Sequence, residues 1–230
     1  MGVAFKSVVR TIRRPVLRAL RSVVDHRLAD FRMPPDIGGD LLLTFDDGPH
    51  PEYTPRLLDM LDAAGARAIF FVIGERAVRH PALLRDCLDR GHVIGNHTFT
   101  HLNDGIGGHY TTERVIDEIT RCAELVAAET GFRTTLFRPP RGEMNLKTLR
   151  GVRATGHSMM LWSVEGGEWG IRSDWAAQDI GDYILRTVRR RDIFLMHDDN
   201  EKTLHVLPRL IRTAQERGYD LASAVARMAA

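Results

Sequence analysis

Cysteine is scarce in this sequence, which contains only Cys87 and Cys122 among its 230 residues. The two fall in separate predicted helices and form no C-x-x-C pair. The sequence therefore gives no support to a disulfide framework or to a zinc site built from thiolates. We expect two buried, reduced thiols instead.

Long hydrophobic runs are missing as well. Basic residues from Lys6 to Arg14 interrupt every apolar stretch after Met1, so no signal-peptide core can be recognised. No later segment approaches the roughly 18 consecutive apolar residues that a membrane-spanning helix requires. These absences predict a cytoplasmic protein with neither a signal peptide nor a transmembrane segment.

A strong net charge is the third absence, because the formal charge is only +2. Its distribution is uneven: residues 1–32 hold eight Lys or Arg and two Asp, net +6, which leaves −4 for the rest. The acidic remainder has no basic stripe interleaved with aromatic residues, so nucleic acid is not expected as a partner. Hydrophobic and charged fractions of 43% and 27% are typical of a globular chain, whose length suits one α/β domain.

The basic character belongs to residues 3–30, where apolar side chains follow a roughly helical repeat with arginines between them. Such a helix can lie on the anionic inner face of a membrane, where each basic residue contributes on the order of 1 kcal/mol. Packing across one end of the domain is the alternative, and both interpretations stay open. Because Pro and Gly at 34–39 indicate a linker, we divide the chain into a basic amphipathic extension with linker, 1–38, and a domain, 39–230.

From Leu41 onward, short apolar runs alternate with helical patterns, which is typical of β/α units around a parallel sheet. A closing strand around residues 219–221 would bring the number of strands to about seven. Strands are predicted at 41–45, 68–73, 92–94, 134–137, 158–162 and 192–196, and helices at 54–64, 81–90, 112–130, 146–155, 175–190 and 203–217. Glycines stand where these helices should end, at Gly65, Gly91, Gly131, Gly156 and Gly218.

Two adjacent carboxylates, Asp46 and Asp47, end the first apolar run and precede the turn Gly48-Pro49. Neighbouring side chains on a strand point to opposite faces, so both can reach one site only where the strand gives way to a loop. One carboxylate could then bind a cation while the other takes a proton. For this motif alone, a simple turn that caps a strand is the alternative.

A pair of histidines, His97 and His101, follows the predicted strand at 92–94. Imidazoles four residues apart lie on one side of a helical turn, and with one carboxylate they make a three-ligand metal site with an open position. An ordinary solvated turn is the alternative for the pair alone. However, the histidines and Asp46 both follow predicted strands, and α/β barrels assemble their active sites at that end of the sheet.

Three more predicted strands run into polar or aromatic groups, and the five motifs together resemble a known family. They are T-F-D-D-G-P at 44–49, H-T-F-T-H at 97–101, R-P-P-R-G at 138–142, W-S-V-E-G-G-E-W at 162–169 and L-M-H at 195–197. In this order they resemble the motifs of the polysaccharide deacetylases, the NodB-homology enzymes of carbohydrate esterase family 4. The resemblance covers roughly residues 40–221. It implies a distorted (β/α) barrel, here of about seven strands with a helical N-terminal extension, and makes 39–230 the catalytic domain.

The resemblance also implies one divalent metal ion, most often Zn²⁺, with Co²⁺, Ni²⁺ and Fe²⁺ as alternatives. Carried onto this chain, it makes Asp47, His97 and His101 the metal ligands and Asp46 the general base. Arg138 would pair with Asp46, and a neighbouring cation keeps a carboxylate ionised. A bound Zn²⁺ lowers the pKa of its water toward about 7, so the base removes a proton from an already acidic water.

His197 would be the general acid that protonates the departing amine. Glu168 would orient His197 through a hydrogen bond. The family usually has aspartates where Glu165 and Glu168 stand, so the reach of that contact must differ by about one methylene. We therefore expect reduced rather than absent activity relative to typical members.

Substrate contact is implied for Pro140, Arg141, Trp169 and Leu195. Leu195 and Trp169 would form the walls around the acetyl methyl group, with simple core packing as the alternative. A backbone N–H near Arg141 would help to hold the tetrahedral oxyanion. The family usually has an aromatic residue at the position of Arg141, whose guanidinium suits a phosphate or carboxylate on an anionic sugar.

The sequence thus predicts a metal-dependent hydrolase that removes N-acetyl groups from an amino-sugar glycan, an oligosaccharide or a lipid-linked sugar. An O-acetyl carbohydrate esterase is one alternative, because the same oxyanion chemistry serves both bonds. A catalytically silent, glycan-binding barrel is another. The presence of a base, an acid and three metal ligands argues against the silent barrel, because a pure binder needs none of them.

Overall fold

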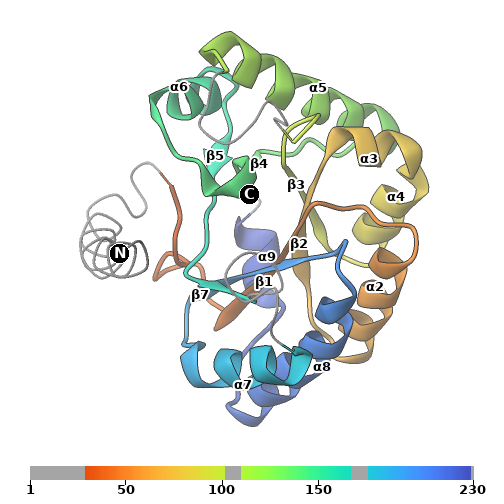
Figure 1. Cartoon of the computed structure of the whole chain (residues 1–230), viewed down its shortest axis with the longest axis vertical. Coiled ribbons are helices and arrows are strands. Elements are labelled where there is room, and N and C mark those ends of the chain that lie inside the picture. Colours follow the sequence, from red (N-terminus) through yellow and green to blue (C-terminus); the bar gives the residue numbers. More distant parts are fainter. Residues whose placement is uncertain (1–28, 102–109, 167–175, 229–230) are drawn as a thin grey trace, which may run out of the picture.

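The chain forms a curled, half-open barrel of parallel strands with helices along its outer face (Figure 1). The computed structural model describes residues 29–101, 110–166 and 176–228. The strands are β1 Leu41–Asp46, β2 Ala68–Val72, β3 Val93–Asn96, β4 Leu136–Phe137, β5 Ser158–Met159, β6 Val164–Glu165 and β7 Asp192–His197. The helices are α2 Tyr53–Ala63, α3 Gly74–Arg79, α4 Pro81–Asp89, α5 Thr112–Thr130, α6 Leu146–Ala154, α7 Ala177–Thr187, α8 Glu201–Glu216 and α9 Ser223–Met228, with a 3-10 turn η1 at Pro140–Gly142. None of the described helices combines the length and apolarity needed to cross a bilayer.

The strand order is that of a barrel cut open between β5 and β6. The seven strands lie in the order β5-β4-β3-β2-β1-β7-β6, and all of their pairings are parallel. Each strand therefore neighbours the next one in the chain except at that break, and β7 returns to β1. The predicted α/β class and the distorted barrel of about seven strands are confirmed.

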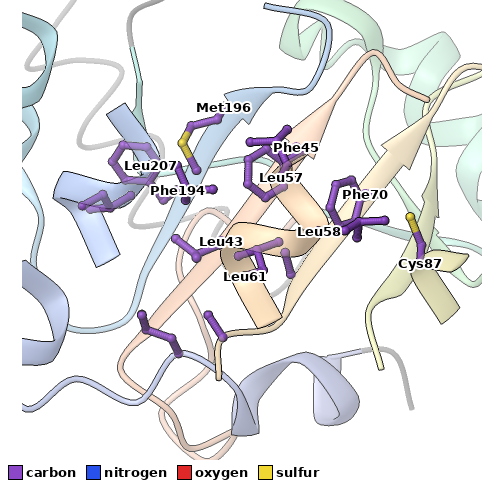
Figure 2. Packing of buried hydrophobic residues seen from close by; sticks show 14 of the residues in the cluster. Leu43, Phe45, Leu57, Leu58, Leu61, Phe70, Cys87, Phe194, Met196 and Leu207 are labelled. Atoms are coloured by element: carbon purple, nitrogen blue, oxygen red, sulfur yellow. The ribbon is translucent and has the colours of Figure 1, made fainter. Parts of the chain in front are cut away.

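The strand β1 is buried on both faces, which explains its continuous apolar sequence. Leu41, Leu43 and Phe45 point outward into the layer between the sheet and the helices. Residues of the opposite parity, from Leu42 to Asp46, face the inside of the barrel, and Leu42 packs there in a second cluster. Figure 2 shows members of the outer layer, among them Leu43, Phe45, Leu57, Leu58, Leu61, Phe70, Phe194 and Leu207.

A short segment before the first strand closes part of the break. Asp30 forms a parallel bridge with Met160, and Arg32 an antiparallel bridge with Asp192. The backbone N–H of Asp30 donates to the carbonyl of Met159 at 2.9 Å. Between these contacts the side chain of Phe31 is buried. The residues at 29–33 therefore connect the chain after β5 to Asp192, the first residue of β7, which β6 does not pair with.

All six predicted helices are present, and their predicted ends lie close to the observed ones. The glycines expected at helix ends have φ between 63° and 77°, the left-handed region that glycine tolerates. Both cysteines are free and buried, as expected, and burial raises the pKa of Cys122 to about 12.

The predicted closing strand at 219–221 is wrong. The carbonyl of Asp220 accepts hydrogen bonds from Asp40 and Leu41, but the chain turns away after these contacts into α9. Three residues of α9, Ala224, Val225 and Met228, pack into the inner cluster. The seventh strand is instead β6, which the sequence did not predict. The predicted strand at 158–162 is shorter than expected, because β5 ends at Met159.

Candidate active site

A cleft of about 700 Å³ opens where the carboxyl ends of the strands meet. Parallel strands bring the residues that follow them to one edge, which is where α/β barrels place their active sites. The cleft is lined by Asp46, Asp47, Ile73, Glu75, Arg76, Arg79, His97, Thr100, His101, Arg141, Trp162, Glu165, Leu195, His197 and Asp199. Most residues predicted from the motifs thus lie on one surface.

The two aspartates at the end of β1 converge because the backbone changes direction between them. Asp46 is the last residue of β1, and Asp47 has φ 74°, in the left-handed region. Gly48 then passes directly against Asp198, where a Cβ atom would lie 2.0 Å from the carboxylate. Only glycine fits this approach. The strand end predicted from the sequence therefore turns both carboxylates toward one site.

The two histidines also converge, although not through the helical turn that their spacing suggested. Residues 97–101 form a loop in which Thr98 and His101 have φ of 70° and 62°. The Nε2 atoms of His97 and His101 lie 3.4 Å and 3.2 Å from Oδ1 of Asp47. One potential ligand atom from each of the three residues lies within 4.8 Å of the others.

This donor set fits a divalent metal. Nδ1 of His97 lies 2.8 Å from the carbonyl oxygen of Arg138. Since a carbonyl only accepts, Nδ1 carries the proton, and the lone pair of the neutral ring is on Nε2, facing Asp47. Oδ1 of Asp47 is buried without a hydrogen-bond partner among the described residues. Two imidazoles and one carboxylate are ligands that suit Zn²⁺ and leave a position open.

The charges at this site reinforce the fit. Burial alone would raise the pKa of Asp47, but His101 and His97 beside it lower that pKa well below its usual range. For His97, burial by itself would lower the pKa of the imidazole. The negative charges of Asp46 and Asp47 outweigh this effect, so the pKa of His97 is raised. The carboxylates of Asp46 and Asp47 therefore favour a positive charge at this position, which a divalent cation would supply.

Arg138 lies behind the aspartates and is fully buried. Its Nη1 donates to Oδ1 of Asp46 at 2.7 Å and to the hydroxyl of Thr44 at 2.8 Å. Nη2 donates to the carbonyl of Leu161 at 2.9 Å. Oδ2 of Asp46 faces the other way and lies 3.8 Å from Nε2 of His97. The guanidinium thus holds one oxygen of Asp46 and leaves the other on the histidine side.

The remaining predicted residues are distributed unevenly. His197 ends β7 and lines the cleft together with Leu195, which is 4% exposed. Arg141 is exposed on the turn η1 with φ 58°. Pro140 is buried and is not among the residues that line the cleft.

Glu168 and Trp169 lie outside the described residues. Trp162 from the same motif is described, and it packs over Gly142, where a Cβ atom would lie 2.6 Å from the ring. The side chain of Glu165 lines the cleft.

The contribution of α3 to the cleft was not predicted from the sequence. Arg76 donates to the carbonyl oxygen of Asp47 at 2.6 Å and pairs with Asp199 at 2.8 Å. Glu75 and Arg79 also line the cleft. A signal was available, because the predicted strand at 68–73 ends at this polar segment, just as the other strands end at their motifs.

Comparison with known proteins identifies the family of this chain. A profile of the polysaccharide deacetylase family matches residues 35–160. A peptidoglycan-N-acetylglucosamine deacetylase of Bacillus cereus is 34% identical over 185 residues, which cover 78% of this chain and 83% of that protein. A chitooligosaccharide deacetylase of Sinorhizobium fredii is 33% identical over 194 residues, 79% of this chain and 88% of that protein. The structure of the peptidoglycan deacetylase PdaC from Bacillus subtilis matches with a TM-score of 0.72 and 28% identity, and covers 81% of this chain and 89% of that one. This chain belongs to the polysaccharide deacetylase family.

Proposed function

We propose that this protein is a metal-dependent deacetylase that hydrolyses N-acetyl groups of an amino-sugar glycan or oligosaccharide. The observation that carries the proposal is the convergence of Asp46 with the group Asp47, His97 and His101 at one cleft. Relatives named as deacetylases of peptidoglycan and of chitooligosaccharides support the substrate class.

Asp47, His97 and His101 would hold the divalent ion, for which Zn²⁺ suits the donor set. Bound there, the ion would acidify a water molecule and polarise the acyl oxygen. Asp46 would take the proton from that water. Because Arg138 occupies Oδ1, the proton goes to Oδ2, the oxygen on the side of His97.

His197 would complete the reaction as the general acid. It ends the strand next to β1, in register with Asp46, and lines the same cleft. The amide nitrogen must gain a proton before the C–N bond breaks, because an amide anion is a very poor leaving group. A backbone N–H near Arg141 would help to stabilise the oxyanion. Glu168 and Trp169 keep their proposed roles, orienting His197 and bounding the acetyl site with Leu195.

The substrate within this class would depend on the arginines of the cleft. Arg141 and Arg79 are exposed and line it, and Arg76 also lines it and donates to the carbonyl oxygen of Asp47. A guanidinium suits a carboxylate or phosphate on the sugar, which includes a lipid-linked sugar. Membrane contact through residues 3–30, nearly all of which lie outside the described part of the chain, stays a prediction, as does a cytoplasmic location.

Acetate release tests the proposal directly. Metal-loaded protein is compared with Asp46→Asn on N-acetylated oligosaccharides, peptidoglycan, lipid-linked N-acyl sugars and O-acetylated xylan. We expect release from an N-acetylated substrate and a loss of about 10² to 10⁴ in rate for Asp46→Asn at unchanged metal content. Asp89→Asn, an exposed position on α4, is the control and should keep full activity.

Three outcomes would contradict the proposal. Release only from xylan would identify an O-acetyl esterase. Wild-type rates in Asp46→Asn would remove the base from its role. No release from any substrate by stoichiometrically loaded protein would favour the silent, glycan-binding barrel.

A further inference from the structure

A buried carboxylate that belongs to none of the five motifs lies beside the histidine loop. Glu118 is in the second turn of α5 and is 0% exposed. Carboxylates are rarely fully buried unless their oxygens are hydrogen-bonded or paired with a cation. The contacts of Glu118 therefore indicate what it is for.

Those contacts are with the backbone between the two histidines. Oε2 of Glu118 accepts hydrogen bonds from the N–H groups of Phe99 at 2.9 Å and Thr100 at 2.7 Å. Oε1 accepts from the hydroxyl of Thr100 at 2.9 Å. Arg114, one turn earlier on α5, supplies the counter-charge at 2.7 Å. A single side chain thus binds three donors in two consecutive residues of the loop.

The loop needs such anchoring because its backbone is unusual. Thr98 and His101 are both left-handed without being glycine, a conformation that persists only where the surroundings hold it. The N–H groups of Gly74 and Glu75 in α3 donate to the carbonyls of Thr98 and Phe99. The start of α3 therefore holds the carbonyls of the loop, and Glu118 holds its amides.

We propose that Glu118 is a positioning residue for the metal site. This role rests on the proposed function. Glu118 fixes the loop so that Nε2 of His97 and Nε2 of His101 both face Asp47 before a metal binds. Without the carboxylate, two backbone N–H groups lose their acceptor and the left-handed residues lose their restraint. The imidazoles must then be aligned at the expense of binding energy, so metal affinity falls. Mutation of a residue that orients metal ligands without binding the metal itself typically lowers metal affinity by about 10- to 100-fold.

The test measures binding of Co²⁺ alone to the full-length, metal-stripped protein, by its visible absorption spectrum and by competition with a chromophoric chelator. We expect Glu118→Ala to weaken Co²⁺ binding by about 10- to 100-fold and to alter the spectrum. Glu118→Gln, whose amide oxygen can still accept from the loop, should recover most of the affinity. Glu124→Ala, an exposed glutamate on the same helix, should bind as the wild type does.

A purely structural role would lower the melting temperature of the metal-free protein and leave the Co²⁺ affinity and spectrum unchanged. Folded Glu118→Ala protein with wild-type affinity and spectrum would therefore overturn the inference. If the alanine variant does not fold, Glu118→Asp decides in the same way, because it keeps the charge beside Arg114 and shortens the reach. Wild-type protein that fails to bind Co²⁺ stoichiometrically would overturn the proposed metal site as well, so the two failures are distinct.

Discussion

Arg138 shows at the scale of a single residue how the site and the fold depend on each other. Its guanidinium links the inner face of β1, through Asp46 and Thr44, to the carbonyls of Met160 and Leu161 after β5. It also lies 4.1 Å from the ring of Phe71. Arg138 therefore neutralises the buried Asp46 and joins two strands that are distant in the sheet.

We predict that Arg138→Met destabilises the protein by about 3 to 5 kcal/mol, because Asp46 is left as a buried charge without its partner. Urea unfolding measures the change, with Arg133→Met, an exposed position, as the near-neutral control. In the double variant with Asp46→Asn the loss should be smaller than in Arg138→Met alone. A loss below about 1 kcal/mol in Arg138→Met would contradict the prediction.

His92 is a buried histidine at the other end of the sheet, away from the metal site. Its Nδ1 accepts a hydrogen bond from the N–H of Ala68, so the neutral ring carries its proton on Nε2, which is buried without a partner in the described structure. Burial lowers the pKa of His92 to about 4, from an ordinary value of 6.5. Between these values the unfolded chain binds a proton that the folded protein does not.

Stability should therefore fall as the pH decreases from 6.5 to 4, by up to about 3 kcal/mol from this residue. In His92→Gln the amide oxygen can still accept from the N–H of Ala68, but the side chain at position 92 no longer titrates. The difference in stability between pH 7 and pH 4.5 should therefore be smaller than in the wild type. Urea unfolding at pH 7 and at pH 4.5 measures the free energy of unfolding at each pH. The exposed variant His205→Gln is the control, and equal pH dependence in all three proteins would contradict the prediction.

At the scale of elements, the segment at 29–33 is the clearest case of a stretch whose role depends on distant strands. Phe31 and Met33 are 7% and 0% exposed. The Nη2 of Arg32 donates to Asp192 at 2.6 Å, across 160 positions of sequence. The segment thus closes part of the barrel that β5 and β6 leave open.

We predict that a variant lacking residues 1–33 is less stable, by about 3 kcal/mol or more, than a variant lacking residues 1–28. Each buried Phe or Met side chain contributes roughly 1.5 to 3 kcal/mol, and only the longer deletion removes both. Urea unfolding of the two proteins provides the measurement. Equal midpoints and slopes would show that the segment adds no stability.

At the scale of the whole molecule, the proposed metal site would join β1 to the loop after β3, so ion binding should stabilise the entire fold. A ligand that binds only the folded state adds about 4 kcal/mol at a concentration 1,000 times its Kd. We predict that Zn²⁺ raises the melting temperature of metal-stripped protein and that Asp47→Asn largely removes this shift. Asp89→Asn should respond as the wild type does. An undiminished shift in Asp47→Asn would place the bound ion elsewhere.

Much of the candidate site could be predicted from the sequence, because the ends of parallel strands can be recognised from short stretches of the chain. Residues that follow parallel strands meet at one edge, so Asp46, Asp47, His97 and His197 were placed together from strand ends alone. The six helices followed from periodicity and terminal glycines. These features depend on short stretches of sequence, each of which carries its own signal.

What the tertiary structure alone decided involves contacts between distant residues or elements too short to show a period. The strand β6, which was not predicted, has only two residues, and hydrophobic alternation needs at least four. The sequence cannot tell that residues 219–221 lead into α9 rather than a strand, because three residues are too few to show a period. Nor can it tell that Glu118 reaches the histidine loop, since this depends on how α5 packs on β3. Local patterns predict which groups meet at the edge of the sheet, and packing decides what holds them there.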